Sequence, residues 1–188
     1  MLQRRTHFAH VLTVMVFAAA PQLNAAEWTL TPSTQVTFGI KSVGLSIVEG
    51  KFNKVQSELK FDPEIPQKGT AELVLDVDSL SLSNPSLKGL ILGSEFFDAE
   101  EFKQVRFTSK QIKPIAYARY QITGDLTIRG VTKPVSFDTM MNPNINNPRL
   151  MDIQSNTTIN RSDFGMRKAL GGVGEQVNIQ LKGQWKVN

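Results

Sequence analysis

Apolar and polar residues alternate with a period of two along most of the chain after Trp28. Each such segment has one apolar face and one polar or charged face. Residues 177–187 show this pattern, and so do residues 118–128, whose even positions are Ala118, Tyr120, Ile122, Gly124, Leu126 and Ile128. Because successive side chains of a strand point to opposite sides of a sheet, the pattern predicts strands that bury one face only. This is typical of antiparallel sheets.

Turn-forming residues divide the alternating segments into about eight predicted strands. The separators are residues 62–66, 130–134 and 142–148, which contain proline, glycine or asparagine. Residues 48–61 form either one long strand or two strands joined at a bend. Eight such strands can close into an antiparallel barrel or stack as a two-layer sandwich, and the alternation alone leaves both open. The predicted fold class is therefore all-β.

Residues 84–102 interrupt the alternation and predict a short helical segment. Ser83 or Asn84 can cap the N-terminus of a helix, and Pro85 follows in its first turn, where a missing N–H costs least. A second helical turn or a loop is expected over residues 94–102. The segment fits a plug or lid over one mouth of the sheet structure.

The first 25 residues predict a cleaved secretion signal. Arg4 and Arg5 precede an apolar run over residues 11–20, and small residues around Ala25 provide a cleavage site. The run is too short to cross the roughly 30 Å core of a bilayer as a helix, which disfavours the alternative of an uncleaved anchor. Residues 26–188 are therefore expected to form one exported domain.

The composition removes most enzyme classes. The chain has no cysteine, and its two histidines, His7 and His10, lie in the predicted signal. A mature domain without these residues has no thiolate nucleophile, no histidine-dependent triad and no imidazole metal ligand. Removing Arg4 and Arg5 from the 21 basic residues leaves 19 against 17 acidic ones, a net charge of +2. Because these basic residues are scattered, we expect no nucleic-acid partner. Because the predicted mature domain lacks cysteine and histidine, we also expect no metal, no cofactor and no enzymatic activity.

Five segments, in order along the chain, resemble the YceI-like family of secreted lipid-binding proteins. They are residues 28–33 with 36–38, residues 50–52, residues 96–98 with 105–109, residues 124–135 (GDLTIRGVTKPV) and residues 160–166 (NRSDFGM). The resemblance extends from about Trp28 to Val187. The chain departs from the family in the predicted lid, where Leu87, Lys88, Leu90 and Ile91 replace a usual Arg-Asp-x-His-Leu run and Lys103 replaces a usual proline.

The resemblance implies a lipocalin-like barrel that encloses an isoprenoid chain, such as the tail of a quinone or of a polyprenyl lipid. It favours the barrel over the sandwich, and it implies a periplasmic binding or carrier protein. The apolar lipid would then be cargo and not a cofactor. A homodimer and transient contact with membranes or membrane proteins are further expectations.

A lipid carrier requires inward-facing apolar side chains with open space between them. The predicted lining is Phe38, Phe52, Leu73, Leu75, Phe107, Tyr120, Ile122, Phe137, Ile179 and Leu181, with Phe96, Phe97 and Phe164 near a mouth. The alternative is that the same residues pack together as a filled core. Arg161 and Asp163 are candidate rim residues that would hydrogen-bond a lipid headgroup, or they belong to a structural turn.

Two other functions remain open from the sequence. An envelope interaction or stress module would have a filled core and no lipid cargo, and would act through its surface. A carboxylate-based enzyme would require two acidic residues that face each other inside the barrel, whereas the strand alternation places most acids outside.

Overall fold

A computed structural model describes residues 25–42, 45–166 and 174–188. The secretion signal predicted for residues 1–25 lies outside this part of the chain, apart from Ala25. The strands are β1 (Ala26–Leu30), β2 (Gln35–Ser42), β3 (Leu45–Phe52), β4 (Val55–Phe61), β5 (Thr70–Asp76), β6 (Leu80–Leu82), β7 (Gln104–Ala116), β8 (Arg119–Ile128), β9 (Val131–Pro143), β10 (Leu150–Asn160) and β11 (Gln176–Val187). One α-helix, α1 (Lys88–Leu92), and four short 3-10 turns complete the described elements.

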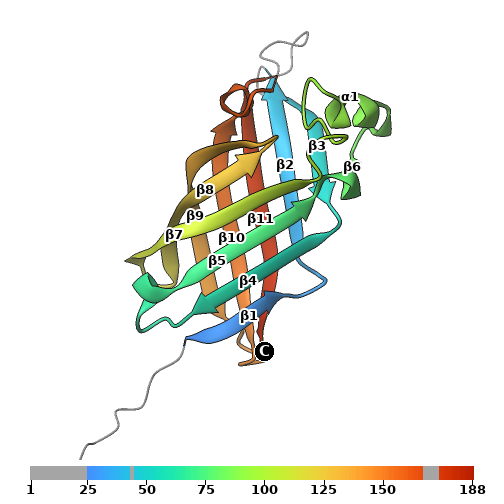
Figure 1. Cartoon of the computed structure of the whole chain (residues 1–188). Coiled ribbons are helices and arrows are strands. Elements are labelled where there is room, and N and C mark those ends of the chain that lie inside the picture. Colours follow the sequence, from blue (N-terminus) through green and yellow to red (C-terminus); the bar gives the residue numbers. More distant parts are fainter. Residues whose placement is uncertain (1–24, 43–44, 167–173) are drawn as a thin grey trace, which may run out of the picture.

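The strand segments form eight antiparallel strands that close into a barrel (Figure 1). β1 and β2 together make one bent strand, because β1 pairs with β4 while β2 pairs with β3. β3 with β4, and β5 with β6, are joined in the same way, since β4 pairs with β5 and β3 pairs with β6. The later strands follow in chain order, and β11 closes the ring by pairing with both β1 and β2. The predicted eight-stranded barrel is confirmed, and residues 48–61 are two segments joined at a bend.

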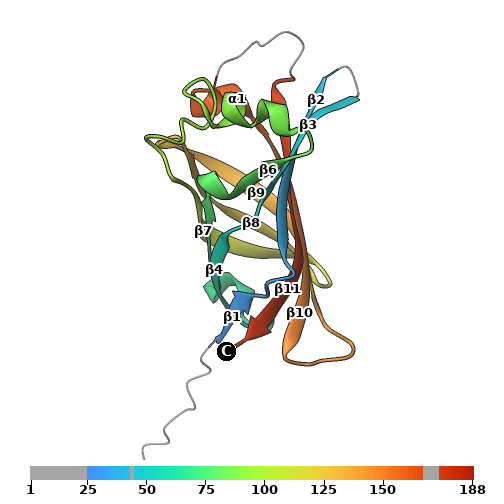
Figure 2. The same cartoon turned by 90° about the vertical axis from the view of Figure 1, so that its right-hand side faces the viewer.

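Hydrogen bonds from Asn53 hold two of the bends together. Asn53 lies between β3 and β4, while the 3-10 turn η2 (Val77–Ser79) separates β5 from β6. The Asn53 side-chain amide donates to the Ser79 carbonyl oxygen at 2.6 Å, and its backbone N–H donates to the Ser79 hydroxyl at 3.2 Å. Among the described strands β6 pairs only with β3, whereas β5 pairs with β7. The hydrogen-bonded pairing of β5 with β7 ends at Asp76 and Gln104, and β6 does not continue it along β7 toward the barrel end that carries α1 (Figure 2).

Burial follows the alternation read from the sequence. Along β8 the even positions from Tyr120 to Ile128 are buried, whereas the odd positions are exposed or half-buried. On the outside, Arg119 of β8 forms an ion pair with Asp138 of β9. The apolar face of β8 therefore points into the barrel, as a closed antiparallel sheet requires.

The predicted helical lid is also present. The 3-10 turn η3 (Pro85–Leu87) leads into α1, and the Asn84 side chain caps this start by accepting a hydrogen bond from the Ser86 N–H at 3.1 Å. Residues 93–101 continue as turns, and the Ala99 N–H donates to the Leu92 carbonyl at 2.8 Å. Figure 2 shows α1 lying across the upper end of the barrel. Within the described residues, no helix combines the length and the apolar character needed to cross a bilayer.

Candidate functional site

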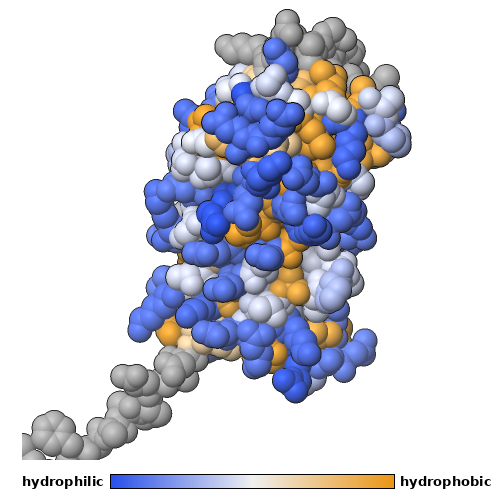
Figure 3. Space-filling model, turned by 45° about the vertical axis from the view of Figure 1, so that its right-hand side comes forward, coloured by the Kyte–Doolittle hydropathy of each residue, from blue (hydrophilic) through white to orange (hydrophobic). Residues whose placement is uncertain are grey.

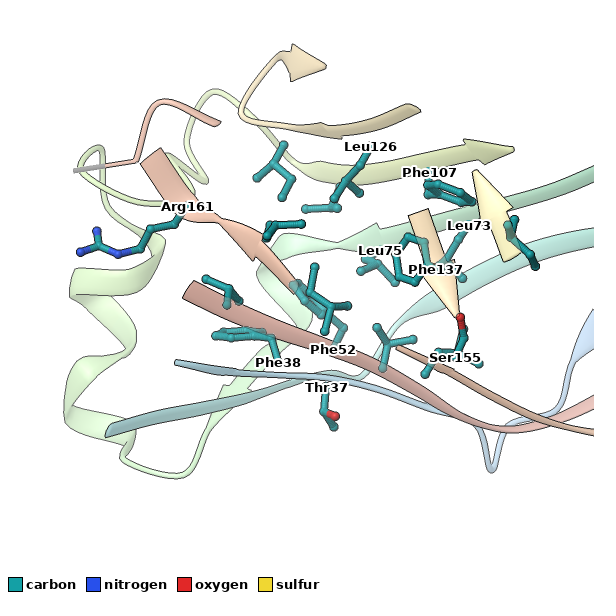
Figure 4. Close-up of a pocket in the computed structure, with 18 of the residues that line it drawn as sticks. Thr37, Phe38, Phe52, Leu73, Leu75, Phe107, Leu126, Phe137, Ser155 and Arg161 are labelled. Atoms are coloured by element: carbon teal, nitrogen blue, oxygen red, sulfur yellow. The ribbon is translucent and has the colours of Figure 1, made fainter. Parts of the chain in front are cut away.

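A cavity inside the barrel extends to the lid (Figure 4). It contains about 1210 Å³ of space, part of which is open to solvent. Besides residues predicted from the sequence, its wall includes Val36, Ile40, Ala71, Ile91, Val105, Leu126, Ile128, Thr139, Ile153, Ser155, Ile159, Met166, Val177 and Trp185. The barrel interior therefore keeps some open apolar space between its side chains.

Most of the predicted lining residues meet in this wall. Eleven of the thirteen do so: Phe38, Phe52, Leu73, Leu75, Phe96, Phe97, Phe107, Ile122, Phe137, Ile179 and Leu181. Leu73, Phe137 and Ile179 point inward but are only partly buried, because part of their surface faces the open cavity. Contact of these side chains with a lipid stays a prediction.

The other two predicted lining residues lie outside the cavity wall. Tyr120 is buried but packs edge-on against Phe61, with ring centroids 5.2 Å apart. Burial raises the pKa of the Tyr120 hydroxyl above its ordinary value, and Tyr117 adds to this shift. Phe164 is buried in the 3-10 turn η4 (Arg161–Phe164), which follows β10. An inward-facing ring can therefore pack against another side chain instead of lining the cavity. The alternation of apolar and polar residues does not distinguish these two cases.

Aromatic rings form two groups along the cavity. Phe38, Phe52 and Phe97 make one cluster, in which ring centroids are 6.0 to 6.1 Å apart. Phe97 belongs to the lid segment, so this cluster connects the lid to β2 and β3. Phe107 and Phe137 form the second group and pack edge-to-face at 5.0 Å. None of these rings carries a hydroxyl that would need a hydrogen-bond partner, which suits an apolar ligand.

The two predicted rim residues occupy different environments. Arg161 is fully buried at the lid end of the cavity, and its guanidinium carbon lies 5.5 Å from the centre of the Phe96 ring. Its Nε donates to the Gly174 carbonyl at 2.9 Å, and in Figure 4 the guanidinium points away from the labelled apolar side chains. Asp163 is exposed, lies outside the wall and accepts a long hydrogen bond from Asn160 at 3.4 Å. Arg161 therefore connects η4 to the lid, and Asp163 lies on the outer side of that turn.

Two hydroxyls in the wall were not singled out from the sequence. Thr139 and Ser155 are almost fully buried, at 0% and 7% exposure, and lie opposite each other on β9 and β10. Their oxygens are 2.7 Å apart, so each hydroxyl provides the hydrogen-bond partner of the other. Trp185 also lines the cavity, and its buried Nε1 has no hydrogen-bond partner within the described residues. Thr139 and Ser155 could have been found from the sequence, because each is a polar residue at an inward position of an otherwise apolar strand face.

The wall provides apolar contact and little charge. Of the lining residues, only Glu72 and Arg161 are ionisable, and Glu72 is an exposed residue at an outward position of β5. These residues do not supply the two facing carboxylates that a carboxylate-based enzyme requires. The described part of the chain also contains no group of three or more His, Cys, Asp or Glu residues placed to hold a metal ion. The arrangement suits an elongated apolar molecule.

Known proteins resemble this chain in sequence, in structure or in both. The YceI-like domain matches residues 28–185. A UPF0312 protein of Yersinia enterocolitica is 28% identical over 163 residues, which are 84% of each chain. BcnA of Burkholderia cenocepacia has a TM-score of 0.75 at 26% identity, over 83% of this chain and 98% of BcnA.

A polyisoprenoid binding domain from Saccharophagus degradans has the same fold, with a TM-score of 0.68 at 12% identity, over 87% of this chain and 99% of that domain. The family match covers nearly the whole barrel, including the segments at residues 124–135 and 160–166 that carried the resemblance in the sequence. The chain belongs to the YceI-like family.

Proposed function

We propose that this protein binds and carries a long apolar lipid in the barrel interior, and that it does so without catalysing a reaction. The cargo is an isoprenoid chain of the quinone or polyprenyl class. The single observation that carries the proposal is a cavity inside the barrel whose wall is built almost entirely from apolar side chains and which reaches a helical lid at one end. The likeness to a polyisoprenoid binding domain supports the same class of ligand.

Burial of apolar surface supplies enough free energy for this function. A chain that loses about 500 Å² of apolar surface to the wall gains roughly 12 kcal/mol, at about 25 cal/mol per Å². Loss of translational, rotational and chain freedom removes a large part of that gain. The remainder is compatible with stable yet reversible binding, and no charged contact is required.

The proposed site of action is the bacterial periplasm. Arg4 and Arg5, the apolar run over residues 11–20 and the small residues near Ala25 support export with removal of residues 1–25. A lipid tail that moves between two membranes there needs shielding from water, which a cavity inside the barrel provides. Transient contact with a membrane or membrane protein, and assembly as a homodimer, are further parts of the proposal.

The direct test is to identify what the purified protein holds. Native mass spectrometry of the full-length gene product, isolated from the periplasmic fraction, should show the chain without residues 1–25 and with a bound lipid. Organic extraction should release an isoprenoid. The delipidated protein should then take up geranylgeraniol more tightly than octadecanol, a linear alcohol of similar length.

Three results would count against the proposal. Recovery of no lipid, together with no uptake of quinone, geranylgeraniol or octadecanol, contradicts a lipid carrier. Equal binding of the linear and branched alcohols contradicts the isoprenoid class and leaves a general apolar carrier. An unprocessed chain in the cytoplasmic fraction contradicts export.

A further inference from the structure

Arg129 is the first residue of the turn between β8 and β9, a position whose backbone conformation favours asparagine or glycine. Ile128 pairs with Val131, and the two residues between them, Arg129 and Gly130, both have positive φ, at 51° and 70°. A two-residue hairpin with positive φ at both positions is a type I′ turn, which favours Asn-Gly because most other residues adopt a positive φ at a cost. Arg129 is thus held in a costly conformation. A side-chain interaction can offset this cost.

The Arg129 side chain makes two contacts with other parts of the barrel mouth. Its Nη1 donates to the Gly165 carbonyl at 2.6 Å, and Gly165 directly follows η4. Its Nη2 lies 3.7 Å from the Asp98 carboxylate, and the two side chains of this pair are only 18% and 22% exposed. Arg129 therefore joins the lid segment to the turn after β10. The ion pair is partly shielded from water, which strengthens it relative to an exposed one.

Asp98 lies within the lid segment, residues 84–102, which covers this end of the cavity. It also has a positive φ, 51°, so the ion pair joins two of the three non-glycine residues with this conformation in the described chain. Its N–H donates to the Gly93 carbonyl, and its own carbonyl accepts from the Phe102 N–H. Phe102 in turn packs on the hairpin turn, since a Cβ atom on Gly130 would lie 2.8 Å from its ring. The hairpin turn and the lid segment thus meet through two separate contacts.

The lid must move before an apolar chain can pass this end of the barrel. Ile91, Phe96 and Phe97 belong to the lid, line the cavity and are at most 8% exposed. Phe96 and Phe97 directly precede Asp98, so the ion pair from Asp98 to Arg129 restrains the backbone that carries their rings. Moving these rings out of the cavity would therefore strain this ion pair.

We propose that Arg129 is a latch that holds the lid through Asp98 and sets the rate at which an apolar ligand enters and leaves the cavity. This role rests on the lipid-binding function proposed above. The latch acts on the barrier to exchange and not on the contacts inside the cavity. Its loss should therefore speed uptake and release together, and should change the dissociation constant little.

The test measures the release of a fluorescent geranylgeranyl chain by stopped flow, with excess vesicles to trap the released probe. Arg129→Asn removes both contacts while placing a favoured residue in the type I′ turn, and Asp98→Asn removes only the ion pair. Each variant should release the probe between about fivefold and twentyfold faster than the parent protein. The double variant should be no faster than Arg129→Asn, because both changes break the same ion pair.

Arg119→Gln is the matched control. It breaks an Arg–Asp pair on the outer face of the barrel, between β8 and β9, and should leave release unchanged. Unchanged release in Arg129→Asn, additive effects of the two changes, or equal acceleration in Arg119→Gln would each overturn the latch.

Hydrogen exchange separates failure of the latch from failure of the proposed function. In protein without ligand, the amides of residues 96–102 should exchange faster in Arg129→Asn and Asp98→Asn than in the parent protein. If no variant takes up the probe, the lipid-binding function is wrong, and unchanged exchange would then also rule out the latch. If the probe binds but its release is unchanged, the latch is wrong and the lipid-binding function stands.

Discussion

The side-chain oxygens of Thr139 and Ser155 lie 2.7 Å apart in the inner wall of the barrel, directly opposite each other on β9 and β10. Their neighbours on the same faces, Phe137 and Ile153, line the cavity with apolar atoms. Two hydroxyls can occupy such a wall because each satisfies the other. Removing one of them leaves a buried polar group without a partner, whereas removing both does not.

This relationship predicts a non-additive pair of substitutions. Thr139→Val and Ser155→Ala should each lower the free energy of unfolding by about 1–2 kcal/mol, because each leaves one buried hydroxyl unpaired. The double variant should lose less than the sum of the two single losses. Urea unfolding of the four proteins measures the coupling, and strictly additive losses would show that the two hydroxyls act independently.

A bulky residue in the wall should block the cavity. Ala71 lines it and is half-buried, so Ala71→Trp places an indole where ligand carbons would lie. If the indole covers about 100 Å² of wall, binding of a geranylgeranyl probe should weaken by about 2.5 kcal/mol, or more than tenfold. Ala116→Trp makes the same change at an exposed position at the end of β7 and should leave the affinity unchanged. Equal affinities of both variants would place the probe elsewhere on the protein.

A glycine on β8 is predicted to be essential for close strand packing. A Cβ atom on Gly124 would lie 2.3 Å from the Thr108 carbonyl oxygen and 2.7 Å from the Ser109 Cα, so the backbone of β7 would have to shift. Gly124→Ala should therefore destabilise the fold by about 1–3 kcal/mol. Gly39 on β2 is the matched control, because a Cβ atom there would have no neighbour within 4 Å. Thermal unfolding should show a clear loss for Gly124→Ala, and a comparable loss for Gly39→Ala would contradict this explanation.

The ion pair on the outer face predicts a shifted carboxyl titration. The hydrogen bond from Arg119, aided by the attraction of its charge, holds the pKa of the Asp138 carboxyl below its ordinary value. A carboxyl with a lowered folded-state pKa contributes stability above its unfolded-state pKa, and this contribution is lost as the pH falls through the folded-state value. Because the pair is exposed, the contribution should be small. NMR titration should show the Asp138 pKa rising in Arg119→Gln, and an unchanged titration would show that the pair is not formed in solution.

Strand alternation predicted much of the fold and most of the cavity wall. It assigned inward positions correctly along β8, and the cap at Asn84 with Pro85 indicated the lid. It did not separate Leu73, which faces open space, from Tyr120, whose ring is covered by Phe61. Both are apolar or aromatic residues at inward positions. Only neighbours on distant strands distinguish them.

The contacts at the barrel mouth could not be predicted from the sequence either. Arg161 was identified as a candidate, but its position beside Phe96 depends on how η4 and the lid meet in space. No sequence pattern identified Arg129 as a contact between elements, because its partners Asp98 and Gly165 are distant from it in the chain.

The sequence by itself determined which face of each strand is buried, because side chains alternate strictly along an extended backbone. It also determined the all-β class and the place of the helical interruption. The tertiary structure decided that the strands close into a ring, and that an apolar cavity remains inside the ring next to the lid. Both outcomes depend on strand register and on packing between side chains far apart in the chain, which local alternation does not encode.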